Sequence, residues 1–306
     1  MNSSWPIGES ARIPRTEQPS RPSIADELIA ATAILESAGI ADPRREATTI
    51  WASLSGLVSG QVWLQQDEPA TEPFSGRFRQ AVERRANGEP LAYVVGIAGF
   101  RTLELIVDQR VLIPRPETEG LVQRVLDWGA TRDTLDWGLA VDVGTGSGCV
   151  ALSLAVEGKF ARVVGTDSSP AALAVAALNL AAVSPGTPVE LREGNGLGAV
   201  SDVRANVIVS NPPYVTAAEF SGLDSGVRNY EPRDALVSGH DGMEHIAGLV
   251  AASSELLEYG GLLAIEIDCT RADRALDLAC RAGWKNARVE DDLFARPRYL
   301  LATKEP

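Results

Sequence analysis

Residues 208–215 read IVSNPPYV, so an apolar run stops at an asparagine, two prolines and a tyrosine. The side-chain oxygen of Asn211 can accept one N–H of a planar amine, and the Pro212 carbonyl can accept the other. Two such bonds would stabilise positive charge forming on a weakly nucleophilic nitrogen and would aim its lone pair. The prolines restrict φ and hold that carbonyl in place, while the tyrosine ring offers a stacking face. These residues predict a catalytic turn that binds a planar NH2 group, made by Asn211, Pro212, Pro213 and Tyr214.

A glycine loop lies upstream, where VDVGTGSG joins an apolar run to a helix-like stretch. Gly144, Gly146 and Gly148 allow a tight turn and let a ligand approach the backbone. Asp167 ends the next apolar run, a position from which a carboxylate can bind ribose hydroxyls. This pattern predicts a nucleotide-type cofactor site.

Two classes of cofactor fit such a loop. A dinucleotide usually requires the spacing G-x-G-x-x-G, and Asp142 beside the loop would repel its diphosphate. S-adenosylmethionine (SAM) has no phosphate, and its amino group and sulfonium are cationic, so the same carboxylate attracts it. We therefore expect SAM, bound by Asp142, Gly144, Thr145, Gly146, Ser147, Gly148, Asp167 and Asn211.

The elements that must position these residues alternate along the second half of the chain. Five apolar runs are separated by Ala- and Leu-rich stretches, which is typical of an α/β fold with a doubly wound parallel sheet and helices on both faces. Ligands bind such sheets at the carboxyl ends of the strands, beside the topological switch point. We expect strands at 139–143, 161–166, 189–192, 206–210 and 262–267, and a closing antiparallel pair at 287–290 and 299–302.

The first third of the chain has a different pattern. Residues 1–22 contain four prolines and no periodicity, which is typical of a disordered tail. Helical spacing predicts helices at 23–38 and 75–87, and another that begins at Asp42-Pro43, with a capping side chain before a proline. Alternating apolar residues at Leu103, Leu105 and Val107 predict a β-hairpin. The expected domains are a tail at 1–22, a helical domain at 23–88, a β-hairpin linker at 89–119 and a cofactor-binding domain at 120–306.

Composition argues against several partners. The net charge is −13, with 28 basic against 41 acidic residues, so direct nucleic-acid binding is not expected. No apolar run approaches the roughly 20 residues of a membrane span. Three distant cysteines, without a C-x-x-C pair, suggest free, buried thiols in a reducing cytoplasm. His240 and His245 would lie off a common helical face, so no metal site is expected.

Five motifs in this order make the chain similar to the release-factor glutamine methyltransferases, the HemK/PrmC family: EPLAYVVGIAGF, VLIPRPETE, VDVGTGSG, VSNPPYV and YEPRDALVSGHDGM. The resemblance spans residues 25–303, and VLIPRPETE discriminates most, because nucleic-acid amine methyltransferases that share NPPY generally lack it. It implies a Rossmann-like class I SAM-dependent methyltransferase sheet. The implied reaction methylates N5 of the glutamine in the Gly-Gly-Gln (GGQ) loop of class I peptide-chain release factors. The helical domain would dock the release factor, and the hairpin with 115–119 would line the pocket.

Two positions depart from the pattern of that family. A Gly-Asp pair usually lies near the adenine, whereas REGNG places Asn195 and Gly196 there. The amide oxygen of Asn195 can still accept from the adenine amine, so we expect both residues to bind SAM. After the fifth strand the family tends to read E-I-G with a later Gln, whereas this chain reads EIDCTRADR, with Asp268.

NPPY alone does not distinguish a glutamine amide from adenine N6 or guanine N2. One alternative is therefore an amine methyltransferase for adenine or guanine in nucleic acid, which predicts a basic surface beside Asn211. Another is a non-catalytic binder of release factors, which would require a lost SAM site. A third is a relative that methylates a secondary metabolite.

Overall fold

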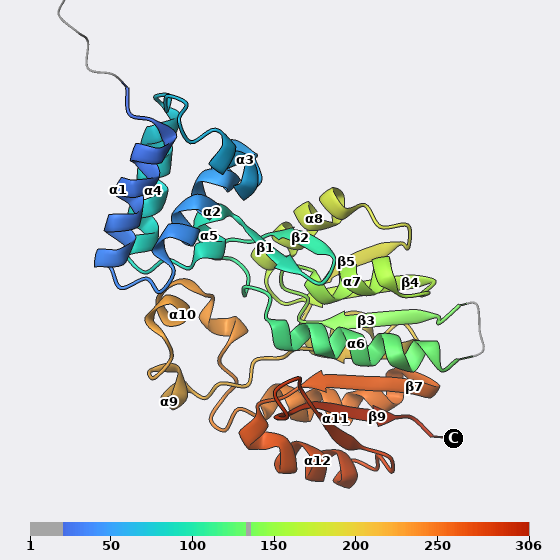
Figure 1. Cartoon of the computed structure of the whole chain (residues 1–306). Coiled ribbons are helices and arrows are strands. Elements are labelled where there is room, and N and C mark those ends of the chain that lie inside the picture. Colours follow the sequence, from blue (N-terminus) through green and yellow to red (C-terminus); the bar gives the residue numbers. More distant parts are fainter. Residues whose placement is uncertain (1–20, 133–135, 306) are drawn as a thin grey trace, which may run out of the picture. The chain divides into compact units, whose positions relative to one another are not determined.

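The computed structural model describes residues 21–132 and 136–305, so the expected disordered tail lies outside the described residues except for its last two. The chain divides into two compact units, and the boundary lies between Asn87 and Gly88. Figure 1 labels most of the helices and strands of both units. None of the helices in the described ranges is long and apolar enough to cross a membrane.

The first unit is helical. Its members are α1 (Ile24–Ser37), α2 (Pro43–Ser55), α3 (Ser59–Leu64) and α4 (Phe74–Ala86). The helix expected at 23–38 is confirmed, and the Ser23 side chain begins it by accepting the N–H of Asp26. Helix α2 begins at Pro43 as expected, but the prediction of a capping side chain is wrong: Asp42 makes no capping hydrogen bond and lies 3.9 Å from Arg45 instead. The short helix α3 has no periodic signal and was not predicted.

Aromatic packing holds this helical unit together. The ring of Trp51 meets Phe74 and Phe78 edge to face, with centroids 4.6 and 4.8 Å apart. Leu35 of α1 and Ile50 of α2 are fully buried, and α1, α2 and α4 contact one another. Helices α1, α2 and α4 therefore share one apolar core.

The second unit is built on a seven-stranded sheet in the order β5-β4-β3-β6-β7-β9-β8. The first five strands are parallel, and the last two are antiparallel, as the sequence predicts. The order runs outward from β3 to β5 and returns to β6, which makes a switch point between β3 and β6. The strands are β3 (Leu139–Val143), β4 (Arg162–Asp167), β5 (Val189–Glu193), β6 (Ala205–Ser210), β7 (Leu257–Glu266), β8 (Arg288–Asp291) and β9 (Pro297–Thr303).

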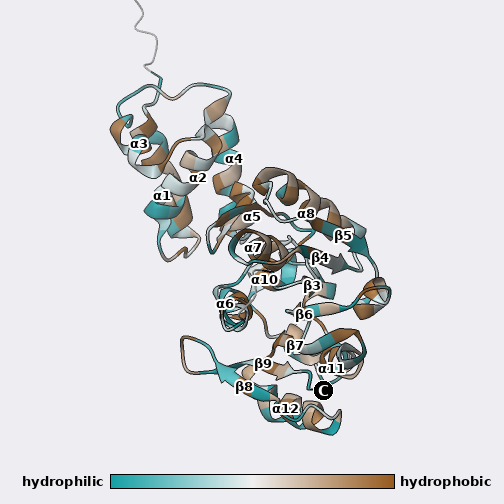
Figure 2. Ribbon diagram, turned by 90° about the vertical axis from the view of Figure 1, so that its right-hand side faces the viewer, coloured by the Kyte–Doolittle hydropathy of each residue, from teal (hydrophilic) through white to brown (hydrophobic). Residues whose placement is uncertain are grey.

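Helices cover both faces of the sheet, which confirms the doubly wound α/β class. The covering helices are α6 (Pro116–Ala130), α7 (Cys149–Glu157), α8 (Pro170–Val183), α11 (Glu244–Leu256) and α12 (Ala272–Arg281). Val141 and Ile208 belong to the core with α11 and α12, whereas Ala140 and Val207 belong to the core with α6 and α7. This alternation follows from the two-residue repeat of a strand. Figure 2 shows α6 on one side of the strands and α11 on the other.

The hairpin expected from alternation is confirmed but is shorter than the 89–119 segment. Strands β1 (Ile97–Phe100) and β2 (Leu103–Ile106) pair antiparallel. A short helix, α5 (Leu91–Val95), precedes them, and α6 begins at Pro116, inside the expected linker. Proline suits the first helical position because its missing N–H would have no partner there, and two acidic residues in the first turn favour that end of the helix.

Strand β7 begins at Leu257, five residues earlier than expected. Gly260 and Gly261 interrupt the alternation of apolar residues in the sequence. In the structure they lie in an irregular part of the strand, where the pairing of β7 with β6 shifts in register. The cysteines are free thiols, but the expectation of burial is wrong. Cys280 is exposed, because it lies on α12 opposite the buried residues Ala275 and Ala279, and the other two are half-buried.

Candidate active site

The glycine loop and the NPPY turn follow two neighbouring strands. Val143 ends β3 and pairs with Ser210, which ends β6. Gly144 and Asn211 therefore leave the sheet side by side, at its carboxyl edge and at the switch point. The fold brings Gly144 and Asn211 together although they lie 67 positions apart in the chain.

A cavity of about 760 Å³ lies at this edge. That volume lies in the range of pockets that enclose a small organic ligand. Eight of the residues predicted for cofactor or substrate line it: Gly144, Gly146, Asp167, Asn195, Gly196, Asn211, Pro212 and Pro213.

The backbone of the glycine loop opens toward this space. Gly144, Gly146 and Gly148 have φ of 77°, 55° and 84°, which only glycine adopts without strain. A Cβ added at Gly144 or Gly146 would have no atom within 4 Å, whereas one at Gly148 would come within 3.2 Å of Leu152. The first two glycines thus leave room for a ligand, and the third fits the loop onto α7.

Asp167 lines the cavity with its carboxylate already oriented. One oxygen accepts the N–H of Gly146 and the other accepts the N–H of Ser169, both at 2.9 Å. A carboxylate oxygen has a second lone pair, so each can still accept a hydroxyl proton. This arrangement suits the two hydroxyls of a ribose.

Four other residues predicted for the cofactor do not line the cavity: Asp142, Thr145, Ser147 and Gly148. Asp142 is buried beneath the loop, where one oxygen accepts from the Thr145 hydroxyl (2.7 Å) and from the N–H of Ala151 (3.1 Å). Burial raises the pKa of Asp142 to about 7, against the opposing effect of these bonds. In this position Asp142 supports the shape of the loop.

Replacement of Asp142 by asparagine is expected to stabilise the protein in alkaline solution. The folded state favours the neutral acid, so stability is lost as the pH rises from the usual carboxyl range to about 7. Asparagine keeps one acceptor oxygen and carries no charge. We therefore expect the free energy of unfolding to rise by about 2 kcal/mol at about pH 8 and by less at about pH 5. Urea unfolding at both pH values measures this, and an equal difference at both would contradict it.

The NPPY turn presents its asparagine in a fixed orientation. Asn211 is half-buried, and its Nδ2 donates to the Thr118 hydroxyl at 2.9 Å. Pro212 is buried, and both prolines line the cavity, whereas Tyr214 does not line it. Burial raises the pKa of Tyr214, so its hydroxyl stays protonated. The structure thus brings three of the four predicted catalytic residues to the cavity wall.

Several lining residues were not among the predicted site residues, although Pro232 and Asp234 belong to the motif YEPRDALVSGHDGM. The set comes from α11, from the segment before VLIPRPETE and from the start of that motif: Arg110, Pro232, Asp234, Glu244, His245 and Leu249. His245 lies at hydrogen-bond distance from the Ser238 hydroxyl, 2.8 Å from its Nδ1. Within residues 21–132 and 136–305, no group of His, Cys, Asp and Glu side chains is placed to hold a metal ion.

Comparison with known proteins gives the family. Residues 27–96 match the PrmC N-terminal domain, and residues 130–222 match the methyltransferase small domain. The release factor glutamine methyltransferase of Moorella thermoacetica is 38% identical over 269 residues, which cover 88% of this chain and 94% of that protein. That of Streptomyces coelicolor is 35% identical over 281 residues, 91% of this chain and 97% of that protein. The chain belongs to the release factor glutamine methyltransferase family.

Membership confirms the family resemblance, the class I methyltransferase fold and SAM as the cofactor of this enzyme. The solved catalytic domain of hMettl16, in complex with MAT2A 3'UTR hairpin 1, matches with a TM-score of 0.51 and 14% identity. That match covers 76% of this chain and 81% of the other, and it shows the fold alone.

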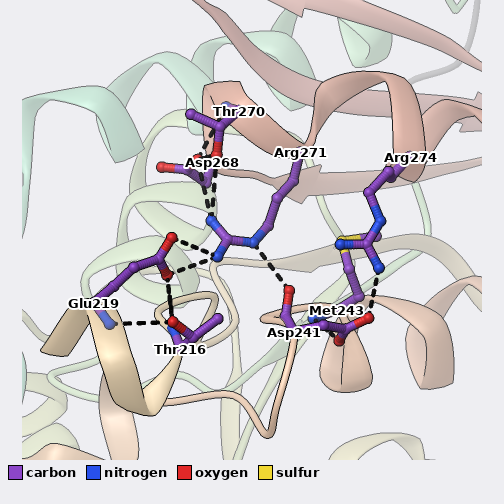
Figure 3. A network of polar contacts seen from close by, with 8 residues as sticks. All are labelled: Thr216, Glu219, Asp241, Met243, Asp268, Thr270, Arg271 and Arg274. Carbon is purple, nitrogen blue, oxygen red and sulfur yellow. Dashed lines mark hydrogen bonds and ion pairs between the residues drawn. The ribbon is translucent and has the colours of Figure 1, made fainter.

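Asp268, which departs from the family pattern after β7, contacts the buried side chain of Arg271 (Figure 3). Its guanidinium donates to both oxygens of Glu219, at 2.9 and 2.7 Å, and to the Asp241 carbonyl at 3.2 Å. Asp268 forms an ion pair with it at 3.2 Å and accepts the N–H of Thr270. Arg271 is buried, so the charge needs these partners. Asp268 thus joins a network that anchors α9 (Ala217–Phe220), just beyond the NPPY turn.

Proposed function

We propose that this enzyme transfers a methyl group from SAM to the side-chain amide nitrogen, N5, of a glutamine in a release factor. The glutamine is that of the GGQ loop of a class I peptide-chain release factor, and the enzyme acts in the cytoplasm, where release factors work. One observation carries the proposal: the glycine loop and the NPPY turn line the same cavity at the switch point. The membership of the chain in the family supports the same substrate.

The residues present fit SAM. Open space at Gly144 and Gly146 admits a ligand to the backbone, Asp167 holds two acceptors for ribose hydroxyls, and Asn195 offers an amide to the adenine. When bound there, SAM supplies a methyl group on a cationic sulfur. Asp142 lies beneath the loop, so we assign its carboxyl group a structural role as a hydrogen-bond acceptor for the loop.

Asn211 and Pro212 then act on the glutamine. A carboxamide nitrogen is a weak nucleophile because its lone pair is delocalised into the carbonyl. Asn211 Oδ1 and the Pro212 carbonyl accept its two N–H groups, which fixes the nitrogen and stabilises the positive charge that grows on it. The nitrogen would take the methyl group that SAM supplies, leaving the sulfur as a neutral thioether, and would then lose one proton to water. No general base is required, because the proton leaves after the methyl group has been transferred.

We propose that the helical unit, residues 23–88, docks the release factor. Ile29, Trp63 and Leu64 are large apolar side chains of this unit that remain more than half exposed. Trp63 and Leu64 are neighbours at the end of α3, and adjoining exposed apolar side chains are typical of protein–protein contacts.

The decisive test is incubation of the enzyme with SAM and a purified class I release factor, followed by peptide mass mapping. We expect one added methyl on the GGQ peptide, and none on a release factor whose GGQ glutamine is replaced by alanine. Parallel reactions contain RNA or DNA in place of the release factor. Methyl transfer to nucleic acid alone would overturn the proposed substrate.

A further inference from the structure

Three side chains from distant parts of the chain form a hydrogen-bonded row behind the NPPY turn. Asn211 Nδ2 donates to Thr118 Oγ1 at 2.9 Å, and that hydroxyl donates to Glu266 Oε2 at 2.7 Å. Thr118 lies in the first turn of α6, and Glu266 ends β7. Thr118 and Glu266 are almost completely buried, at 2% and 1% exposure.

Proton counting fixes the direction of this row. A hydroxyl group has one proton, and an ionised carboxylate can only accept. Thr118 must therefore give its proton to Glu266 and can only accept from Asn211. The amide of Asn211 must turn its nitrogen to Thr118, which leaves Oδ1 as the group available to a ligand.

The opposite orientation of the amide would prevent the reaction. An amide rotated by half a turn would present two N–H donors to a substrate NH2 group, which is itself a donor. A hydrogen bond would then be replaced by the contact of two donors. The site needs something that selects one orientation, because the two ends of an asparagine side chain have nearly the same shape.

We propose that Thr118 and Glu266 are positioning residues that fix the Asn211 amide with its oxygen toward the substrate nitrogen. This proposal rests on the proposed function, since it assumes that a substrate N–H meets Oδ1. Neither residue contacts the reacting atoms. The VLIPRPETE segment thus acts through the asparagine of the NPPY turn.

The row also makes the orientation depend on pH. Burial raises the pKa of Glu266 to about 7, against the hydrogen bond from Thr118. A protonated Glu266 can donate to Thr118, whose own proton is then free to turn to Asn211 Oδ1. The other titratable and charged groups around Glu266 are Arg115, Glu117, Cys149, Tyr214, Arg298 and Tyr299. The two arginines favour the ionised form, and Glu117 opposes it. The rate of methyl transfer should therefore fall as the pH falls through about 7.

The test compares Thr118→Val and Thr118→Ser with the wild type. Valine removes the hydroxyl with little change in shape, whereas serine retains it. We expect kcat for the release factor to fall by about tenfold to a hundredfold in Thr118→Val, with unchanged SAM affinity, and to be largely restored in Thr118→Ser. The acid limb of the pH profile should be present in the wild type and absent in Thr118→Val. Thermal unfolding of each variant confirms that it is folded.

A spectroscopic readout separates this proposal from the proposed function. The Asn211 side-chain amide, observed by 15N NMR without substrate, should exchange its protons slowly in the wild type and in Thr118→Ser, and faster in Thr118→Val. A Thr118→Val enzyme with wild-type kcat, or a serine variant no better than valine, would overturn the proposal. So would equal exchange in all three. If the three proteins show the expected exchange rates but the wild type methylates no release factor, the proposed function is overturned and the positioning role of Thr118 is not. An acid limb that persists in Thr118→Val would belong to another group, such as Asp142, and would overturn the assignment to Glu266.

Discussion

An enzyme with Asn211→Ala is expected to methylate a release factor at least about a hundredfold more slowly than the wild type, with a much smaller loss of SAM affinity. The reason is that alanine removes the acceptor that orients the glutamine nitrogen and stabilises its growing charge. The loss should lie in kcat, since those interactions strengthen as the new bond forms. Single-turnover rates and SAM titration measure the two quantities separately.

The isosteric variant Asn211→Asp provides the matched control. It keeps an acceptor oxygen but places a carboxylate oxygen against the Thr118 hydroxyl, whose proton Glu266 already accepts. We expect it to be nearly as slow as the alanine variant. Methylation at the wild-type rate by Asn211→Ala would show that the acceptor role belongs elsewhere.

The second large effect is expected at the cofactor. Asp167→Asn should weaken SAM binding by about thirtyfold to a hundredfold, because hydrogen bonds to a charged acceptor are the stronger ones. Asparagine has one acceptor oxygen, so it cannot accept from Gly146 and Ser169 as the carboxylate does. Calorimetric titration with SAM measures the effect.

Asp277→Asn is the control for that experiment. Asp277 is an exposed carboxylate on α12, paired with Arg281 one helical turn away, so its replacement removes the same charge without touching the cavity. Equal SAM affinity of Asp167→Asn and Asp277→Asn would contradict the role of Asp167.

The parts of the site that could be predicted lie within continuous motifs. The glycine loop, Asp167 and Asn211 each follow an apolar run that reads as a strand, and parallel strands place their carboxyl ends at one edge. Local sequence thus carried both the residue types and their approximate position. The buried position of Asp142 could not be inferred, because a carboxylate beside a glycine loop can point to the ligand or beneath the loop with the same sequence.

The contacts of the supporting residues could not be predicted, because they join distant segments. The family resemblance pointed to 115–119, which contains Thr118, but as pocket lining, and these residues do not line the cavity. Thr118 meets Asn211 across 93 positions and Glu266 across 148, and no periodicity records such pairs. In the sequence, His245 was considered only together with His240, as a metal site that was not expected. It reaches the cavity because α11 packs beside η1 (Gly196–Val200), a tertiary contact.

In the fold, strongly periodic elements were predicted well and short ones were not. Strand β3 was predicted with its bounds, because four of the five residues in LAVDV are apolar and a glycine follows them. Helices α3 and α5 have six and five residues, too few for a helical repeat to show. Their formation depends on packing that the local sequence does not encode.

Strand β9 completes the support of α6, the helix that carries Thr118. Strand β9 pairs with β7, and the hydroxyl of Tyr299 donates to the Glu117 carbonyl at the start of α6, 2.7 Å away. A nascent chain halted before residue 297 would hold its glycine loop and its NPPY segment without this brace. The orientation of Asn211 should therefore depend on residues that are synthesised after both motifs.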